Sequence, residues 1–170
     1  EVWCRHVRPG CWPDCDMLPL GRLAVNDGGR ATNFTRDEQV TMMTLWCIFR
    51  SPLMLGCELR ECDAWTLSLL TNPEVLHLET DSSGAEQLAR DERRAVWASR
   101  DSGGGVNLAL FNLSDETARV GVPLAEAGLR GRQAVRDLWA RADLTSAEDS
   151  VSAELPPHGA ALYRLSPLRG

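Results

Sequence analysis

The sequence predicts a chain that changes fold class near residue 80, from α/β in the first half to all-β in the second. In the first half, helical apolar stretches alternate with a short continuous apolar run, which is the α/β signature. In the second half, short apolar segments follow one another between Gly- and Pro-rich turns, which indicates an antiparallel sandwich. A polar stretch at residues 81–84 is the expected linker.

The first elements are turns and a loop. Residues 9–21 are dense in Pro and Gly and predict a short extended segment held between turns. Residues 22–34 carry Asn26, Asp27 and Gly28 and predict a loop.

A largely buried helix is expected next. Thr35 and Glu38 form a capping box at its start. Apolar residues between 40 and 49 cover most of the helix circumference, which is typical of a buried helix. Pro52 ends it, because the residue before a proline avoids the α region.

A strand and two further helices complete the first half. Residues 53–56 are a continuous apolar run, which predicts a strand buried on both faces, as in a parallel sheet. Asp63 is expected to cap a helix that runs to Leu70, and Asn72 with Pro73 to start another. Strands of the second half are expected at residues 95–98, 106–113, 118–122, 134–139, 151–155 and 160–165.

Composition excludes several classes of protein. The net charge is −6 and no basic stripe occurs, so we expect no nucleic acid partner. No apolar run approaches the ~20 residues of a membrane span, so we expect a soluble protein and no membrane partner. The chain begins without Met or a signal peptide, and we expect a fragment. A secreted or periplasmic parent stays open, and the sequence does not indicate an oligomeric state.

All six cysteines lie in the first 62 residues, at positions 4, 11, 15, 47, 57 and 62. Cys11 and Cys15 are spaced C-x₃-C, and Cys57 and Cys62 are spaced C-x₄-C. Zinc binding, one or two disulfides, and free thiols packed as small apolar residues are the three hypotheses. The spacings are irregular for a zinc ribbon, and no His stands at ligand spacing.

A series of motifs resembles one enzyme family. Residues 10–18, GCWPDCDML, resemble the W-x-D-x-D-M-L signature of glycoside hydrolase family 27. Further similar segments follow in the same order along nearly the whole chain, at residues 37–39, 45–46, 49–54, 64–76, 109–114, 135–139 and 155–160. Together they are similar to the bacterial type of α-galactosidase, or melibiase. The cysteines depart from the family's pattern.

The resemblance implies an α/β plus all-β architecture. Residues 1–80 would be the C-terminal segment of a (β/α)₈ TIM barrel, about its last two β/α units, and residues 81–170 an antiparallel β-sandwich domain. A complete barrel needs roughly 250 residues. The implied activity is removal of terminal α-galactosyl residues with retention, by an Asp nucleophile and an Asp acid/base upstream of this chain. We therefore expect the chain alone to be inactive, with no catalytic residue, metal or cofactor of its own.

The resemblance also implies a sugar site, with an α-galactoside or related glycan as the partner. By motif position, Asp16 and Met17 match residues that line the galactose pocket, and Trp12 and Asp14 are expected to support the strand end. A carboxylate at the carboxyl end of a barrel strand can accept sugar hydroxyl hydrogen bonds, and a thioether can pack on C–H groups. Strand alternation would point Asp14 and Asp16 the same way, although one of them as a buried cap or turn residue stays open. Two residues on one strand cannot straddle a glycosidic bond, so this pair is not the catalytic pair.

Two hypotheses from other classes stay open. The β-sandwich could be a carbohydrate-binding module without chemistry, with Trp65, Trp97 and Trp139 as a sugar-binding face or as core residues. The cysteines could instead belong to a metal-binding or redox protein.

Overall fold

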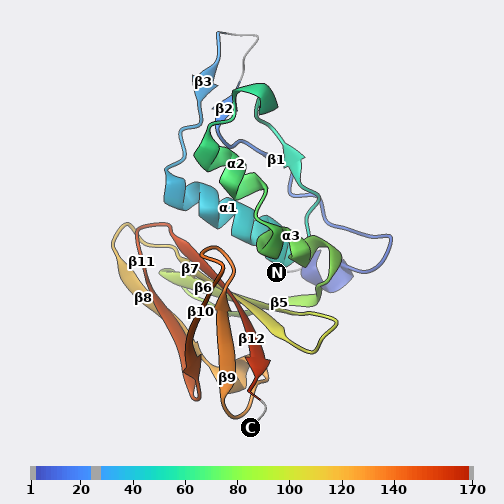
Figure 1. Cartoon of the computed structure of the whole chain (residues 1–170), viewed down its shortest axis with the longest axis vertical. Helices are drawn as coiled ribbons and strands as arrows, with labels where there is room; N and C mark the ends of the chain where they lie inside the picture. The colour runs from blue at the N-terminus through green and yellow to red at the C-terminus, as the bar shows by residue number, and fades with distance from the viewer. Residues whose placement is uncertain (1–2, 24–27, 169–170) are drawn as a thin grey trace.

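A computed structural model describes residues 3–23 and 28–168, which form two regions packed against each other (Figure 1). We call residues 3–80 the N-terminal region and residues 83–167 the sandwich. The elements of the N-terminal region are η1 (Trp3–His6), β1 (Met17–Leu18), β2 (Arg22–Leu23), β3 (Arg30–Ala31), α1 (Arg36–Phe49), β4 (Met54–Leu55), η3 (Leu59–Glu61), α2 (Ala64–Leu70) and α3 (Pro73–Thr80).

The helices of the N-terminal region begin where the sequence predicts. The Thr35 side chain accepts a hydrogen bond from the Glu38 amide while the Glu38 carboxylate accepts one from the Thr35 amide, so the capping box of α1 is confirmed. Asp63 caps α2 and Asn72 caps α3, also as predicted. α1 ends at Phe49, because Arg50 adopts the left-handed conformation with φ 59°. Within the described residues no helix combines the length and apolar character needed to cross a bilayer.

The strand pairs of the N-terminal region are short and differ from two predictions. β1 and β4 pair in parallel, with Met17 opposite Met54. The prediction that residues 53–56 are buried on both faces is wrong, because Met54 is 51% and Leu55 36% exposed. β4 pairs only with β1 among the described residues, so no further strand covers its other side. The loop predicted for residues 22–34 contains the antiparallel pair β2–β3, and Asn26 and Asp27 lie outside the described residues.

The sandwich consists of a six-stranded and a two-stranded antiparallel sheet. The strand orders are β10-β9-β12-β7-β6-β5 and β11-β8. The strands are β5 (Ser83–Arg90), β6 (Arg94–Arg100), β7 (Val106–Asn112), β8 (Ala118–Pro123), β9 (Gln133–Asp137), β10 (Ala142–Ala147), β11 (Ser150–Leu155) and β12 (Ala160–Pro167). Between β8 and β9 lies η4 (Leu124–Ala127).

Six of these strands were predicted from the sequence and are confirmed, while β5 and β10 were missed. β10 lies at the sheet edge with most of its residues exposed, so it lacks apolar alternation. The linker predicted at residues 81–84 is wrong in its second half, because β5 begins at Ser83 and the chain passes from α3 almost directly into the sheet.

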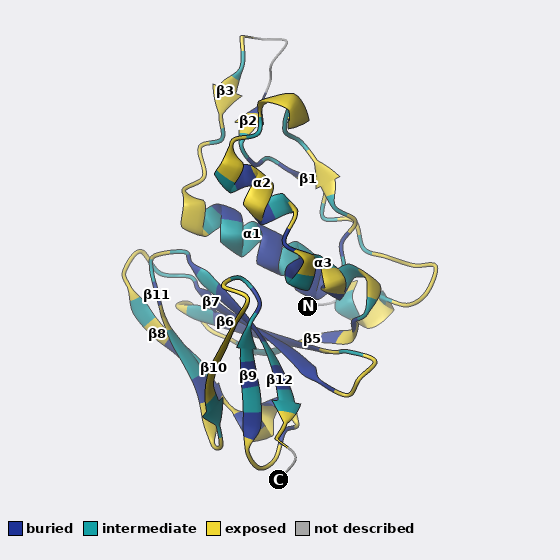
Figure 2. Ribbon diagram, in the orientation of Figure 1, coloured by how far each residue is buried: buried dark blue, intermediate teal, exposed yellow. Residues whose placement is uncertain are grey.

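The six-stranded sheet has an apolar core on each face (Figure 2). On one face, residues such as Leu108 and Leu110 pack with Val122 of β8. On the other face, Ala109 and Phe111 join a cluster with residues of α1 and α3. All seven residues of β7 are therefore buried. The N-terminal region rests on the sandwich through this second core.

Polar contacts also join the two regions. The Trp139 indole donates to the Thr44 hydroxyl of α1 at 2.9 Å. The side-chain amide of Asn72 donates to the Leu138 carbonyl at 2.9 Å. Both contacts are directional, so they fix the orientation of α1 and α3 on the sheet.

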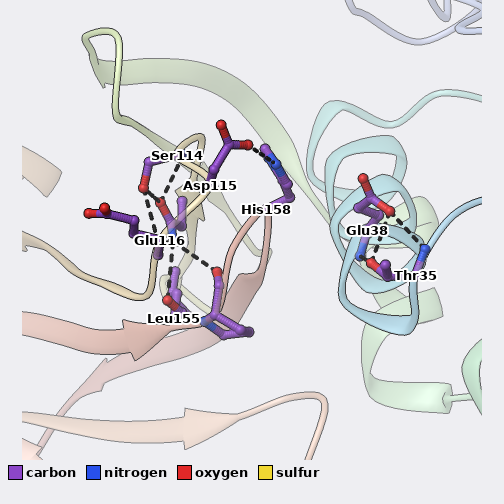
Figure 3. A network of polar contacts seen from close by, with 9 residues as sticks. Thr35, Glu38, Ser114, Asp115, Glu116, Leu155 and His158 are labelled. Carbon is purple, nitrogen blue, oxygen red and sulfur yellow. Dashed lines mark hydrogen bonds and ion pairs between the residues drawn. The ribbon is translucent and has the colours of Figure 1, made fainter.

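The turn before β12 makes a further contact with α1. The Thr41 hydroxyl donates to the His158 carbonyl at 2.6 Å. The His158 ring lies 2.9 Å from the Asp115 carboxylate, and Figure 3 shows both beside the Thr35–Glu38 capping box. The start of α1 is therefore positioned over the β11–β12 turn.

Candidate functional site

The candidate residues Trp12, Asp14 and Asp16 lie on the loop that leads into β1, and Met17 is the first residue of β1. The Asp14 carboxylate accepts a hydrogen bond from the Asp16 amide at 2.7 Å, and the Asp16 carboxylate accepts one from the Met17 amide at 2.6 Å. Asp16 has φ 70°, in the left-handed region, which Asp and Asn adopt more readily than most residues. The loop is thus folded by its own aspartates.

This geometry corrects two predictions. Asp14 and Asp16 are not alternate residues of one strand, because Asp16 is left-handed and β1 begins only at Met17. Asp16 also lies at the start of β1 and not at its carboxyl end. Asp14 is a turn residue, as one alternative held, but it is exposed and not buried.

The carboxyl end of α1 holds the loop in place. The Trp46 indole donates to the Asp16 carbonyl at 3.0 Å, and the Ser51 hydroxyl accepts from the Cys15 amide at 2.9 Å. Ser51 is fully buried. These two bonds span 30 and 36 residues of sequence, and the sequence alone assigned Trp46 and Ser51 no role at the site. Trp46 and Ser51 fall inside the motif segments, which was the only signal that pointed to them.

Arg50 links the loop to the other end of the N-terminal region. Its guanidinium lies 4.1 Å from the centroid of the Trp12 ring. The same group donates to the Glu79 carbonyl at 2.7 Å and to the Ser82 carbonyl. A cation is favoured where the carbonyls of a helix end, and α3 ends at Thr80. Arg50 therefore ties Trp12 to the junction between α3 and β5.

A partly buried carboxylic acid, Glu79, lies next to this junction. Burial raises the pKa of Glu79 to about 7, and the nearby Arg50 and a hydrogen bond with Cys47 oppose the rise only in part. The buried Oε1 atom of Glu79, Nε of Arg50 and Oγ of Ser82 have no hydrogen-bond partner among the described residues. Among the described carboxyl groups, Glu79 has a strongly raised pKa. It lies at the junction between α3 and β5 and not on the candidate loop, so we assign it a structural role.

The loop presents its side chains on an open surface. Met17 is 55% and Trp12 39% exposed, and Met17 lies beside the exposed Met54 across the parallel pair. Asp16 is exposed as well. A carboxylate, two thioethers and an indole in this arrangement can accept hydrogen bonds from hydroxyl groups and pack against C–H groups.

The cysteines do not gather into a metal centre in the part of the chain that the structure describes. That part contains no group of three or more His, Cys, Asp or Glu side chains placed to hold one ion. Cys11, Cys15, Cys47, Cys57 and Cys62 are present as thiols. Cys57 and Cys62 approach each other, with their Sγ atoms 3.9 Å apart.

The three tryptophans considered as a sugar-binding face are divided by the fold. Trp97 lies in the core, edge to face with Phe49 at 5.7 Å. Trp65 of α2 and Trp139 after β9 both line a cleft of about 520 Å³ between the N-terminal region and the sandwich. Ser68, Thr71 and Arg141 also line this cleft.

Two family models match this chain. Residues 2–81 match the family model described as alpha galactosidase A, and residues 91–165 match the alpha galactosidase C-terminal beta sandwich domain. The chain belongs to glycoside hydrolase family 27. Its α/β and all-β parts are accordingly the C-terminal part of a TIM barrel and a β-sandwich.

Individual members of family 27 are similar over the whole chain. Alpha-galactosidase 2 of Arabidopsis thaliana is 32% identical over 98% of this chain. The crystal structure of a GH27 β-L-arabinopyranosidase from Geobacillus stearothermophilus is 49% identical over 99% of this chain, with a TM-score of 0.95. A variant of that enzyme in complex with arabinose superposes with a TM-score of 0.94.

This family 27 chain spans only part of those relatives. It covers 41% of the Arabidopsis enzyme and 40% of the Geobacillus chain. The loop from Trp12 to Met17 and the residues of α1 that hold it lie in the barrel-type match, and Trp139 lies in the sandwich-type match.

Proposed function

We propose that this chain is the C-terminal part of a retaining glycosidase that acts on α-galactosides or related glycans. Residues 1–80 would complete the catalytic barrel, and residues 81–170 would form the domain that supports it. The observation that carries the proposal is the Trp12–Met17 loop. It holds an exposed carboxylate and thioether rigidly beside an open parallel strand pair, inside the segment that matches the α-galactosidase family.

Within this proposal, each loop residue has a separate role. Asp16 accepts hydrogen bonds from sugar hydroxyls, and Met17 packs against the C–H face of the ring. Asp14 fixes the Asp16 amide, and Trp12 anchors the loop on Arg50. Sugar recognition by Asp16 therefore depends on the conformation of the loop before β1, which α1 and the Asp14 side chain hold in place.

The catalytic carboxylates are proposed to lie upstream of this chain. A retaining mechanism needs two carboxyl groups about 5–5.5 Å apart that flank the scissile bond. Asp14 and Asp16 are two positions apart in one turn, and each holds a backbone amide of that turn. They serve the shape of the loop and are poorly placed to flank a bond.

Two sugars fit the proposal. The relatives are named for α-galactosides and for β-L-arabinopyranosides. An arabinopyranose ring lacks the hydroxymethyl group of galactose but keeps hydroxyl groups on its ring. Both sugars can therefore donate hydroxyl hydrogen bonds to Asp16. Hydrolysis of both p-nitrophenyl glycosides should therefore be measured.

A chimera tests the proposal. The part of the Geobacillus arabinopyranosidase that precedes its similarity to this chain would be joined to residues 1–170. We expect the chain alone to hydrolyse neither glycoside, and the chimera to hydrolyse at least one. In the chimera, Asp16→Asn should lower kcat/KM by about 10²-fold, since it leaves a sugar hydroxyl mispaired.

The controls separate sugar binding from folding. Asp37→Asn lies on the exposed first turn of α1 and should leave kcat/KM unchanged. Turnover by the chain alone, or a folded and active chimera that is indifferent to Asp16→Asn, would contradict the assignment.

A second candidate function is glycan binding without chemistry at the Trp65–Trp139 cleft. Its volume of about 520 Å³ suits one or two sugar rings, and the indole of Trp139 is held in place by Thr44. Tryptophan fluorescence titrated with galactose or arabinose tests it. Saturable quenching that Trp65→Ala removes would support this function, and unchanged fluorescence at high sugar concentration would reject it.

A further inference from the structure

Two cysteines face each other in the loop that follows β4. The Sγ atoms of Cys57 and Cys62 are 3.9 Å apart, and both residues are partly buried. The short helix η3 lies between them. A disulfide requires an S–S distance near 2.05 Å, so the sulfurs need to move only roughly 2 Å closer.

The loop holds the two thiols together through contacts that do not involve sulfur. The Glu58 carboxylate accepts from the Arg60 amide at 3.1 Å and pairs with its guanidinium at 2.9 Å. The Glu58 amide donates to the Arg22 carbonyl at 2.9 Å, and Arg22 pairs with Glu61 at 2.6 Å. These contacts fix the first residues of the loop and attach the loop to Arg22 of β2.

From this geometry we infer that Cys57 and Cys62 are an oxidisable dithiol, which a small-molecule disulfide such as oxidised glutathione converts into an intrachain disulfide. One cysteine thiolate attacks oxidised glutathione, forms a mixed disulfide and releases one glutathione thiol. The second thiolate then attacks the cysteine sulfur of that mixed disulfide and releases the other glutathione. Two cysteine thiols are oxidised, one glutathione disulfide is reduced, and the two protons leave with the two glutathione thiols.

The surroundings favour oxidation of the pair over metal binding. A structural zinc takes four ligands, and no third His, Cys, Asp or Glu joins these thiols among the described residues. Burial and the neighbouring Cys62 raise the pKa of Cys57 to about 11, so exchange through the Cys57 thiolate should become faster as the pH rises. The inference does not depend on the proposed glycosidase function.

Peptide mapping tests the inference, because Arg60 lies between the two cysteines. The folded chain is incubated with oxidised glutathione, alkylated and digested with trypsin. Trypsin cleaves after Arg50, Arg60 and Arg90, which places Cys57 on peptide 51–60 and Cys62 on peptide 61–90. We expect these two peptides to appear joined by a disulfide and to separate on reduction.

Matched variants show whether the pair itself is responsible. Cys57→Ser and Cys62→Ser should each abolish the joined peptide, whereas Cys11→Ser, at an exposed cysteine, should retain it. Closing a ring of this size should raise the Tm of the chain by about 5 °C, and the Cys57→Ser/Cys62→Ser double variant should show no such shift. Stable glutathione adducts on Cys57 or Cys62 without the joined peptide would overturn the inference, as would joining only under denaturing conditions.

Discussion

The two regions of this chain differ in how completely they cover their own strands. In the sandwich, every residue of β7 is buried between two apolar cores. In the N-terminal region, β1 and β4 form a two-residue parallel pair that leaves Met17, Met54 and Leu55 exposed. Both regions contain apolar strands, but β7 is covered on both faces by described residues, whereas β1 and β4 are not.

The covered region contributes most of the stability, and the open region carries the candidate site. The sandwich and α1 share a core, so they supply a rigid base. The candidate loop lies at the open edge, held to that base by α1 and Arg50. Sites are more precise when rigid elements position them, and here the rigid element is the end of α1.

The largest expected difference concerns equivalent truncations in the two regions. Leu110 is fully buried in the sandwich core, whereas Met54 is half exposed. Leu110→Ala should lower the free energy of unfolding by about 3–4 kcal/mol, because it removes buried methyl groups and leaves a cavity. Met54→Ala should lower it by less than about 1 kcal/mol. Urea unfolding followed by far-UV circular dichroism measures both, and equal losses would show that the strand pair is covered in solution.

The junction between the regions should respond to pH. The folded-state pKa of Glu79 is about 7, above its ordinary value of 4.5. Between these values the folded chain holds a proton that the unfolded chain has released, so the free energy of unfolding falls as the pH rises from 4.5 to 7. The loss should be about 2 kcal/mol, below the upper limit set by the pKa difference.

Glu79→Gln provides the check on that pH dependence. Glutamine cannot ionise, so the variant should lose less stability than the wild type over this pH interval and should be the more stable of the two at pH 8. Cys47 and Arg50 face the same carboxyl group and remain unchanged in the variant. An identical pH profile for both proteins would show that Glu79 titrates normally.

Local chemistry made part of this fold predictable. The starts of α1, α2 and α3 were predicted because Thr35, Asp63 and Asn72 bond to amides only two or three residues away. The burial of residues 53–56 was not, because an apolar run does not reveal whether a covering partner is present. β10 was missed since an exposed edge strand carries no apolar alternation.

The candidate site shows the same limit. Its motif residues, such as Asp16 and Met17, were found because they are contiguous in sequence. The left-handed backbone of Asp16 and its contact with Trp46, 30 residues away, follow from tertiary packing. No spacing rule relates such residues, so the loop's shape required the structure.

A smaller effect is expected from the ion pair that bridges the regions. Arg136 of β9 forms a bidentate pair with Glu74 of α3 at 2.7 and 3.0 Å and also contacts Asp143 of β10 at 3.1 Å. Glu74 is 29% and Asp143 84% exposed. Glu74→Gln should lower the free energy of unfolding by about 1 kcal/mol, and Asp143→Asn by close to zero.

The pH dependence identifies the contribution of Glu74. Arg136 lowers the pKa of Glu74, so the stabilisation is present above the ordinary carboxyl pKa and disappears as the pH falls through the lowered value. Wild type and Glu74→Gln should therefore converge in stability at strongly acidic pH. A constant difference at all pH values would assign the effect to packing.

The smallest expected effect is local to the loop. Trp46→Phe removes the donor to the Asp16 carbonyl while keeping an aromatic ring, and should lower the free energy of unfolding by about 0.5–1 kcal/mol. Ser51→Ala removes the acceptor of the Cys15 amide. Hydrogen exchange of the Cys15 and Asp16 amides should accelerate by roughly 2- to 5-fold in each variant, while exchange within β7 stays unchanged. Uniform acceleration in both regions would mean that the loop opens only when the whole chain unfolds. Accelerated exchange confined to the loop would instead show that the end of α1 sets the position of Asp16. That role would not require any strand that pairs beside β1.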